Sequence, residues 1–497
     1  MMFQSEDCLD LPSLGAKHAA PRTRLSLMFR FCKLCSPAVA ADVALLLNAL
    51  TISGLGVLVQ FAYYWTFFND GVRLDDYTVI CIAVGLVYFL TARFVIGLNF
   101  DAMQQGLAAA WQSAKALAIA LGIFLIGVFL AKTTATHSRG WFLLWILASC
   151  LSLALLHVAI AKTFAALIRM PDSPYRRRVA AFGAPHLLNA LQAHFSVASS
   201  TGEAVVHTVS VPKNADEPAF RQAMASFIKY CRANPISEVI IALTSSDESR
   251  VLAAVNLFSS LPVDVRLAPD RAVFALASTP FLAGEKLPLL VVSSRPIGDW
   301  GKLLKELFDR VTAALLLLFM APLFVLVASA IKLDSRGPVF FKQQRNGFNH
   351  RTFTMWKFRS MTHASEPQDG PYRQATRADP RITRVGAFLR KTSIDELPQL
   401  INVLRGEMSL VGPRPHPLTL DSQYMTLIDQ YATRHAVLPG ITGWAQVNGY
   451  RGETETRDKM ASRVAYDLHY IRNWSLSLDA WILALTAVRG FVHKNAY

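Results

Sequence analysis

Four apolar stretches joined by short loops occupy the first third of the chain. They cover approximately residues 38–61, 77–98, 113–131 and 141–168. Each is close to the length, about 20 residues, at which an apolar helix crosses a bilayer. The pattern therefore predicts four transmembrane helices within residues 37–168, preceded by a basic tail over residues 1–36.

The charges around these stretches predict an orientation. Basic residues gather before the first stretch and after the fourth, whereas the loop 69–76 is net acidic. Lys and Arg concentrate on the cytoplasmic side of membrane proteins, so both ends of the bundle are expected in the cytoplasm. Lys132 and Arg139, in the second outer loop, run against this rule.

A fifth apolar run, residues 311–331, has Pro322 in its middle and basic residues on both flanks. Its length fits an ordinary fifth spanning helix, in which proline is tolerated. Proline also removes a helical hydrogen bond and kinks the helix, and the basic flanks both favour the cytoplasm. A re-entrant helix that enters and leaves on the same face is therefore the alternative.

Residues 176–295 have the composition of a soluble α/β domain. Four β-rich runs alternate with helical patterns, at Arg178–Phe182, Val205–Val211, Glu238–Leu243 and Leu289–Ser293. This order predicts a Rossmann-like domain with a parallel sheet. The first run leads into Gly183, where a dinucleotide fold carries its glycine loop, but one glycine stands where the fingerprint needs three. A bound dinucleotide is not expected.

Composition agrees with an integral membrane protein, because 53% of the residues are hydrophobic and the mean hydropathy is +0.31. The net charge of +15 suits contact with anionic lipid or with anionic substrates. Nucleic acid is the least favoured partner, since the chain carries membrane helices. The six cysteines are scattered and imply no disulfide framework.

Candidate chemistry is concentrated in the last third, where Asp395 and Glu396 are adjacent. One such carboxylate can attack a phosphorus centre while the other holds a divalent cation. The cations expected to neutralise phosphate oxygens are Lys357, Arg359, Arg390 and Lys391.

The same residues also fit a purely structural interpretation. Ser393-x-x-Glu396 matches a capping box, with Ser393 as the N-cap of a helix. The two interpretations are compatible, because a helix N-terminus also favours bound phosphate.

Rigid loops follow this pair. Arg414 stands between Pro413 and Pro415, which hold it for a bidentate contact with an anion. His416 and His435 flank these loops, and we assign both a structural role.

Several motifs together carry a family resemblance. They are Lys357-Phe358-Arg359-Ser360-Met361, Asp379-Pro380-Arg381-Ile382-Thr383-Arg384-Val385-Gly386, Asp395-Glu396-Leu397-Pro398-Gln399-Leu400, Val411-Gly412-Pro413-Arg414-Pro415 and Pro439-Gly440-Ile441-Thr442-Gly443-Trp444. In order and spacing, from about residue 303 to the C-terminus, they resemble the bacterial sugar transferases that are monotopic phosphoglycosyl transferases. The whole layout is similar to the undecaprenyl-phosphate glucose phosphotransferases of exopolysaccharide synthesis.

This resemblance implies an α-rich transferase domain over residues 303–497 with a re-entrant membrane helix at 311–331. It implies that Asp395 attacks the sugar-bearing phosphate of a UDP-sugar and expels UMP, and that undecaprenyl phosphate then takes the phosphoryl-sugar. Glu396 is expected to carry Mg²⁺. Arg381 is added to Lys357, Arg359, Arg390 and Arg414 as an expected phosphate-binding residue.

The expected location is the bacterial inner membrane, with several membrane passes and a cytoplasmic catalytic domain. A homodimer and other polysaccharide-assembly enzymes are the expected protein partners. Two alternatives stay open: the same reaction with galactose or another hexose, and a non-catalytic membrane scaffold. A nucleotide-sugar dehydratase or epimerase is not favoured, because the chain lacks the glycine fingerprint and the Tyr-x-x-x-Lys pattern.

Overall fold

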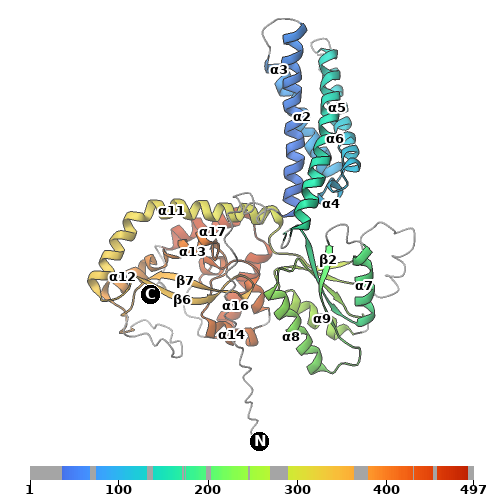
Figure 1. Cartoon of the computed structure of the whole chain (residues 1–497). Coiled ribbons are helices and arrows are strands. Elements are labelled where there is room, and N and C mark those ends of the chain that lie inside the picture. The colour runs from blue at the N-terminus through green and yellow to red at the C-terminus, as the bar shows by residue number, and fades with distance from the viewer. Residues whose placement is uncertain are drawn as a thin grey trace.

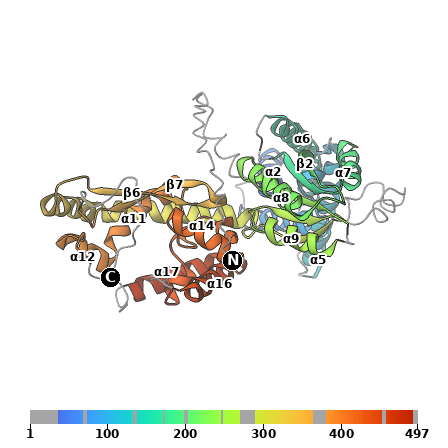
Figure 2. The ribbon, with the colours of Figure 1, turned by 90° about the horizontal axis from the view of Figure 1, so that it is seen from below.

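The computed structural model describes residues 36–67, 74–130, 132, 138–170, 173, 175–197, 203–244, 247–268, 289–362, 379–428, 430–450 and 456–490. The predicted basic tail, residues 1–36, lies outside these ranges except for its last residue. In the described part, an upright helical bundle stands on a body made of a sheet domain and a larger, mostly helical domain (Figure 1). Figure 2 shows these two domains side by side from below.

The bundle confirms the four predicted apolar helices. They are α2 (Pro37–Phe67), α3 (Leu74–Leu90), α5 (Leu107–Leu130) and α6 (Arg139–Arg169), with a π-helical turn at Thr91–Val95 and the short α4 (Phe100–Met103). Their facing sides bury a core that includes Leu45, Tyr88 and Trp145, while their outer sides leave large apolar residues exposed. Helices that are apolar on all sides are suited to lipid rather than water.

A polar cluster lies inside the bundle. Each of the four long helices contributes one buried side chain to it: Asn48, Tyr88, Ser113 and His157. His157 Nε2 lies 2.6 Å from Ser113 Oγ and 3.2 Å from Asn48 Nδ2. Polar contacts between helices hold transmembrane bundles together, because lipid supplies no hydrogen-bond partners.

The sheet domain has the strand order β2-β1-β3-β4-β5. Its strands are β1 (Arg177–Gly183), β2 (Glu203–Ser210), β3 (Glu238–Ala242), β4 (Asp264–Leu267) and β5 (Leu290–Ser293), and its helices are α7 (Pro185–Val197), α8 (Glu217–Ala233) and α9 (Glu248–Phe258). The first three predicted runs form the parallel strands β1, β2 and β3, and β4, which was not predicted, is parallel as well. The fourth predicted run, β5, is instead an antiparallel edge strand. Gly183 packs so tightly that an added Cβ would lie 1.9 Å from the carbonyl oxygen of Ala242. The close packing of β1 against β3 therefore explains why residue 183 is a glycine.

The C-terminal domain is mainly helical, as predicted. Its elements are α11 (Asp299–Asp334), the hairpin β6 (Phe340–Asn346) and β7 (Thr352–Phe358), α12 (Arg384–Thr392), the 3-10 turn η6 (Ile394–Glu396), α13 (Gln399–Arg405), β8 (Ser409–Val411), α14 (Leu418–Leu427), η7 (Tyr431–Ala436), β9 (Gly440–Thr442), α15 (Trp444–Val447), α16 (Arg457–Arg472) and α17 (Leu476–Gly490). Strands β8 and β9 pair in parallel, which brings together the motifs Val411–Pro415 and Pro439–Trp444.

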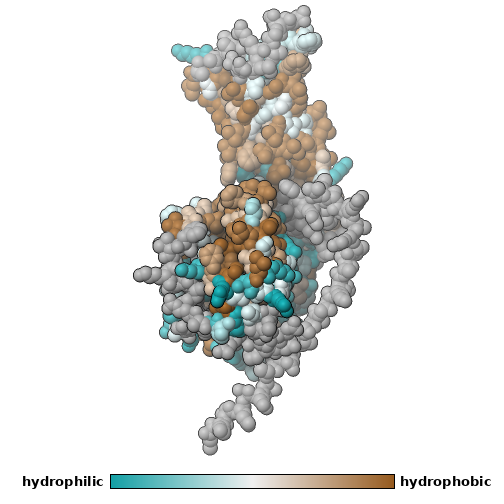
Figure 3. Space-filling model, turned by 90° about the vertical axis from the view of Figure 1, so that its left-hand side faces the viewer, coloured by the Kyte–Doolittle hydropathy of each residue, from teal (hydrophilic) through white to brown (hydrophobic). Residues whose placement is uncertain are grey.

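Helix α11 contains the fifth apolar run but is much longer than residues 311–331. It has 36 residues, and Pro322 lies inside it without ending it. In Figure 1 the helix starts near the foot of the bundle, runs away from it along the top of the body, and bends towards its far end, as an interior proline explains. Its apolar side chains are highly exposed, with Phe319 at 83%. Seen from that end, the body is hydrophobic just below the bundle and hydrophilic further down (Figure 3).

Candidate active site

The local backbone turns Asp395 and Glu396 inward. Helix α12 ends at Thr392 and is followed by its C-cap Ser393, whose left-handed conformation (φ 57°, ψ 17°) is costly for a residue with a Cβ. The chain then makes the single turn η6, which carries both carboxylates. Ser393 makes no side-chain capping hydrogen bond, so the predicted capping box is wrong.

Glu396 is instead captured by two cations. Its Oε1 accepts a hydrogen bond from Lys357 Nζ at 2.7 Å and another from Arg414 Nη2, and its Oε2 accepts one from Arg414 Nη1 at 3.0 Å. Burial opposes ionisation of Glu396, but Arg414 and Lys357 outweigh it and hold the pKa well below its usual range. Glu396 is therefore a fixed, ionised carboxylate.

Asp395 has a different environment. It is 9% exposed, and none of the described residues donates a hydrogen bond to its carboxylate. Burial raises its pKa to about 6; Lys357 opposes this rise and the charge of Glu396 adds to it. Adjacent carboxyl groups with separated pKa values commonly take different chemical roles. At neutral pH Asp395 is ionised with free oxygens, which is what a nucleophile requires.

The predicted phosphate-binding residues divide into two groups. Lys357 and Arg414 contact Glu396, and the positive charge of Arg390 lowers the pKa of Asp395. Arg359 is buried away from this pair and donates to Ser335 O at 2.7 Å, at the end of α11. Arg381 pairs with Asp379 at 2.6 Å. Arg359 and Arg381 thus have structural contacts here, and phosphate binding by them stays a prediction.

A second buried ion pair supports the Arg414 loop. Arg434 Nη2 donates to the backbone oxygen of Arg414 at 2.9 Å, and Arg434 Nε donates to Asp467 Oδ2 at 2.8 Å. Arg434 Nη1 also lies 3.0 Å from His416 Nδ1. Sequence reasoning missed Arg434 and Asp467, because no motif or spacing connects η7 with α16.

Arg463 adds a further buried positive charge near this loop. It is 4% exposed, and its Nε and Nη2 have no hydrogen-bond partner within the described part of the chain. Burial lowers its pKa to about 10; Asp467 opposes this shift, and Arg434 and Arg414 add to it. The region behind Glu396 is therefore rich in positive charge, as a site for phosphate groups requires.

One of the histidines next to these loops, His416, has buried side-chain contacts, and a structural role for both stays a prediction. His416 is buried, with Nδ1 2.7 Å from the hydroxyl oxygen of Tyr431. Burial and the charges of Arg434 and Arg463 hold its pKa well below the usual range, so its ring is neutral.

A buried polar network fixes α11 to the active-site loop. Lys305 Nζ donates to Val411 O at 3.1 Å and to Asp479 Oδ2 at 2.6 Å, and the hydroxyl of Tyr470 donates to Val411 O at 3.0 Å. Val411 ends β8 and is three residues before Arg414. Helix α17 thus packs one face into the core through Asp479, while Trp481 on another face is exposed.

The carboxylate pair can be compared with the needs of Mg²⁺. The described residues contain no group of three or more His, Cys, Asp or Glu that could hold a metal ion. Mg²⁺ usually takes only one or two carboxylates and completes its shell with water and substrate phosphates. Asp395 and Glu396 supply that number of carboxylates, although both oxygens of Glu396 already accept hydrogen bonds from Lys357 and Arg414, so Glu396 would bind the metal through its remaining lone pairs.

Two stretches of the chain match known protein families. Residues 300–493 match the bacterial sugar transferase family, and residues 101–269 match the CoA-binding domain family. The chain belongs to the bacterial sugar transferase family.

Three relatives carry more specific names. A UDP-glucose:undecaprenyl-phosphate glucose-1-phosphate transferase of Xanthomonas campestris is 35% identical over 76% of this chain and 78% of its own length. One of the same name from Escherichia coli is 44% identical over 55% of this chain and 59% of its own length. An undecaprenyl-phosphate glucose phosphotransferase of Komagataeibacter xylinus is 54% identical over 54% of this chain. The chain spans 51% of the K. xylinus protein, so it matches little more than half the length of the last two relatives.

Proposed function

We propose that this protein transfers glucose 1-phosphate from UDP-glucose to undecaprenyl phosphate, releases UMP, and so begins an exopolysaccharide repeat unit. The observation that carries the proposal is the division of roles between two neighbouring carboxylates. Asp395 is ionised and free of hydrogen bonds from described residues, whereas Glu396 is held by Lys357 and Arg414. The names of the relatives support the choice of substrates.

The reaction has two balanced steps. A carboxylate oxygen of Asp395 attacks the sugar-bearing phosphorus; an O–P bond forms, the bond to UMP breaks, and UMP leaves. An oxygen of undecaprenyl phosphate then attacks the same phosphorus, which breaks the bond to Asp395 and restores its carboxylate. Phosphoryl transfer depends mainly on positioning and on charge neutralisation, which Lys357, Arg390 and Arg414 provide. Glu396 would hold Mg²⁺, which when bound neutralises charge on the diphosphate.

We also propose that α11 is re-entrant and that the catalytic domain is cytoplasmic, at the bacterial inner membrane. Asn349, beyond α11, donates to Arg232 O of the sheet domain at 3.4 Å, a contact that needs both domains on one side of the membrane. The bend of α11 supports the same topology (Figure 1). Cysteines introduced at Trp300 and Phe340 should both be labelled from the cytoplasmic side. Periplasmic labelling at 340 would contradict this topology.

The enzymatic proposal is tested by UMP release from UDP-glucose with purified protein, undecaprenyl phosphate and Mg²⁺. Asp395→Asn should lose turnover, and Asp458→Asn, an exposed carboxylate on α16, is the matched control. Turnover by Asp395→Asn equal to that of the unchanged protein would reject the nucleophile. If turnover is the same with and without a divalent metal ion, the proposal that Glu396 holds Mg²⁺ is rejected.

A panel of UDP-sugars tests the sugar. The proposal is supported if UMP release is fastest from UDP-glucose. Faster release from another UDP-hexose would select that sugar instead, and no release from any UDP-sugar would favour the non-catalytic scaffold. A homodimer and contacts with other assembly enzymes stay predictions.

A further inference from the structure

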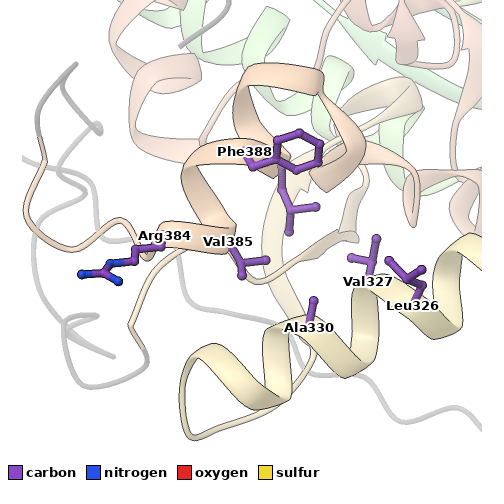
Figure 4. Close-up of a pocket in the computed structure, with 7 residues that line it drawn as sticks. Leu326, Val327, Ala330, Arg384, Val385 and Phe388 are labelled. Carbon is purple, nitrogen blue, oxygen red and sulfur yellow. The ribbon is translucent and has the colours of Figure 1, made fainter.

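A groove of about 390 Å³ lies between the C-terminal part of α11 and α12. Its lining includes Leu326, Val327 and Ala330 on α11 and Val385 and Phe388 on α12, with Arg384 at its edge. Figure 4 shows apolar side chains from both helices around this space, while the guanidinium of Arg384 points away from them. The volume is within the range of about 300–1,000 Å³ that is typical of small-molecule sites.

The groove shares a wall with the active site. Leu389, another lining residue, packs in one buried cluster with Val327, and Ile394 and Leu397 pack against that cluster. Ile394 and Leu397 directly flank the carboxylate pair. An apolar chain in the groove would therefore lie behind the turn that carries Asp395.

The surroundings indicate an apolar chain with an anionic end. The rim is open and apolar, since Leu326 is 66% exposed, Phe388 59% and Leu333 89%. Such a surface is suited to lipid rather than water. Towards the active site, α12 ends in Arg390 and Lys391, which attract a phosphate.

We propose that the groove binds the first isoprene units of the lipid acceptor and directs the attached phosphate to Asp395. This inference rests on the proposed function. The acceptor phosphate must reach the phosphorus bound to Asp395, so its chain must leave the site through an adjacent apolar surface. The groove is such a surface, and the buried cluster that forms its floor packs against the turn that carries the nucleophile.

The proposal can be tested with a substitution that fills the groove. Ala330→Phe places a ring in it, and Ser329→Phe adds the same ring to a neighbouring exposed position that does not line the groove. Ala330→Phe should raise the KM for undecaprenyl phosphate about tenfold, the change expected from losing contact with about two methylene groups. The control should not change it. Phe388→Ala, at an exposed position on the opposite wall, should also raise this KM.

Exchange of labelled UMP into UDP-glucose separates this inference from the proposed function, because that exchange requires Asp395 and no lipid. Ala330→Phe should keep the exchange rate of the unchanged protein. If the unchanged protein shows no exchange, the proposed covalent step is rejected. If Ala330→Phe shows normal exchange and an unaltered KM for undecaprenyl phosphate, the groove assignment is overturned.

Direct labelling identifies the occupant. A photoreactive isoprenoid phosphate should label peptides from α11 and α12, and excess undecaprenyl phosphate should prevent the labelling. Equal labelling by a photoreactive phosphatidylglycerol would show an ordinary membrane lipid in the groove and overturn the proposal.

Discussion

Asp395→Asn should stabilise the folded protein at neutral pH while it abolishes turnover. The Asp395 carboxylate is buried, accepts no hydrogen bond from described residues and lies beside the ionised Glu396. Ionising it therefore costs folding free energy, and a neutral amide of the same shape avoids that cost.

The magnitude follows from the pKa of Asp395, which is raised from 3.8 to about 6. A shift of about 2 units at 1.36 kcal/mol per unit corresponds to about 3 kcal/mol of folding free energy. The folded state binds the proton more tightly than the unfolded state between these two pKa values. Stability of the unchanged protein therefore falls as pH rises from about 4 to about 6, and stays lower above pH 6.

Thermal unfolding of the detergent-solubilised protein at pH 7.5 and at pH 4 measures this effect. Asp395→Asn should raise Tm by several degrees at pH 7.5, and most of the difference should disappear at pH 4, where Asp395 is protonated in the folded state and partly protonated in the unfolded state. Asp458→Asn should change Tm at neither pH, because it is exposed. Equal or lower Tm of Asp395→Asn at pH 7.5 would refute the assigned environment of this carboxyl.

Three further predictions concern the same region. Turnover requires ionised Asp395, so kcat/KM for UDP-glucose should fall as pH drops through about 6, and a flat profile down to pH 5 would contradict this. Arg434→Met should cost about 3–5 kcal/mol in chemical unfolding, because it leaves Asp467 buried and unpaired, and Arg434→Met/Asp467→Met should cost less than the sum of the two single changes. Ser393→Val should destabilise the protein by about 1–2 kcal/mol, whereas Ser393→Gly should not, because only glycine adopts the left-handed conformation freely. Equal unfolding midpoints for these two variants would reject the strain at this turn.

Local patterns predicted the apolar helices well and charged interactions poorly. The four bundle helices follow from the length of continuous apolar sequence, because each such stretch must satisfy its own backbone in lipid. The start of α11 does not follow from that pattern. Its first turns carry Lys305 and Asp309, which are both buried. Their partners come from distant segments: Lys305 pairs with Asp479, 174 residues later, and Asp309 accepts a hydrogen bond from Ser409 at 2.7 Å.

The capping box shows why local reasoning failed at the site. Ser393-x-x-Glu396 has the right spacing for a cap. In the fold, Lys357 on β7 and Arg414 after β8 reach Glu396 and form hydrogen bonds in which both partners are charged. The motif predicted the carboxylates correctly as candidate site residues but gave Glu396 the wrong partners.

The sequence by itself determined the apolar helices, the α/β order of the middle domain and the adjacent carboxylates, because each depends on residues close together in the chain. Tertiary structure alone decided which carboxylate is held and which is free, that Arg434 and Asp467 support the Arg414 loop, and that α11 and α12 enclose a groove beside Asp395. These features depend on burial and on charges brought together from distant segments, and only the folded chain provides both.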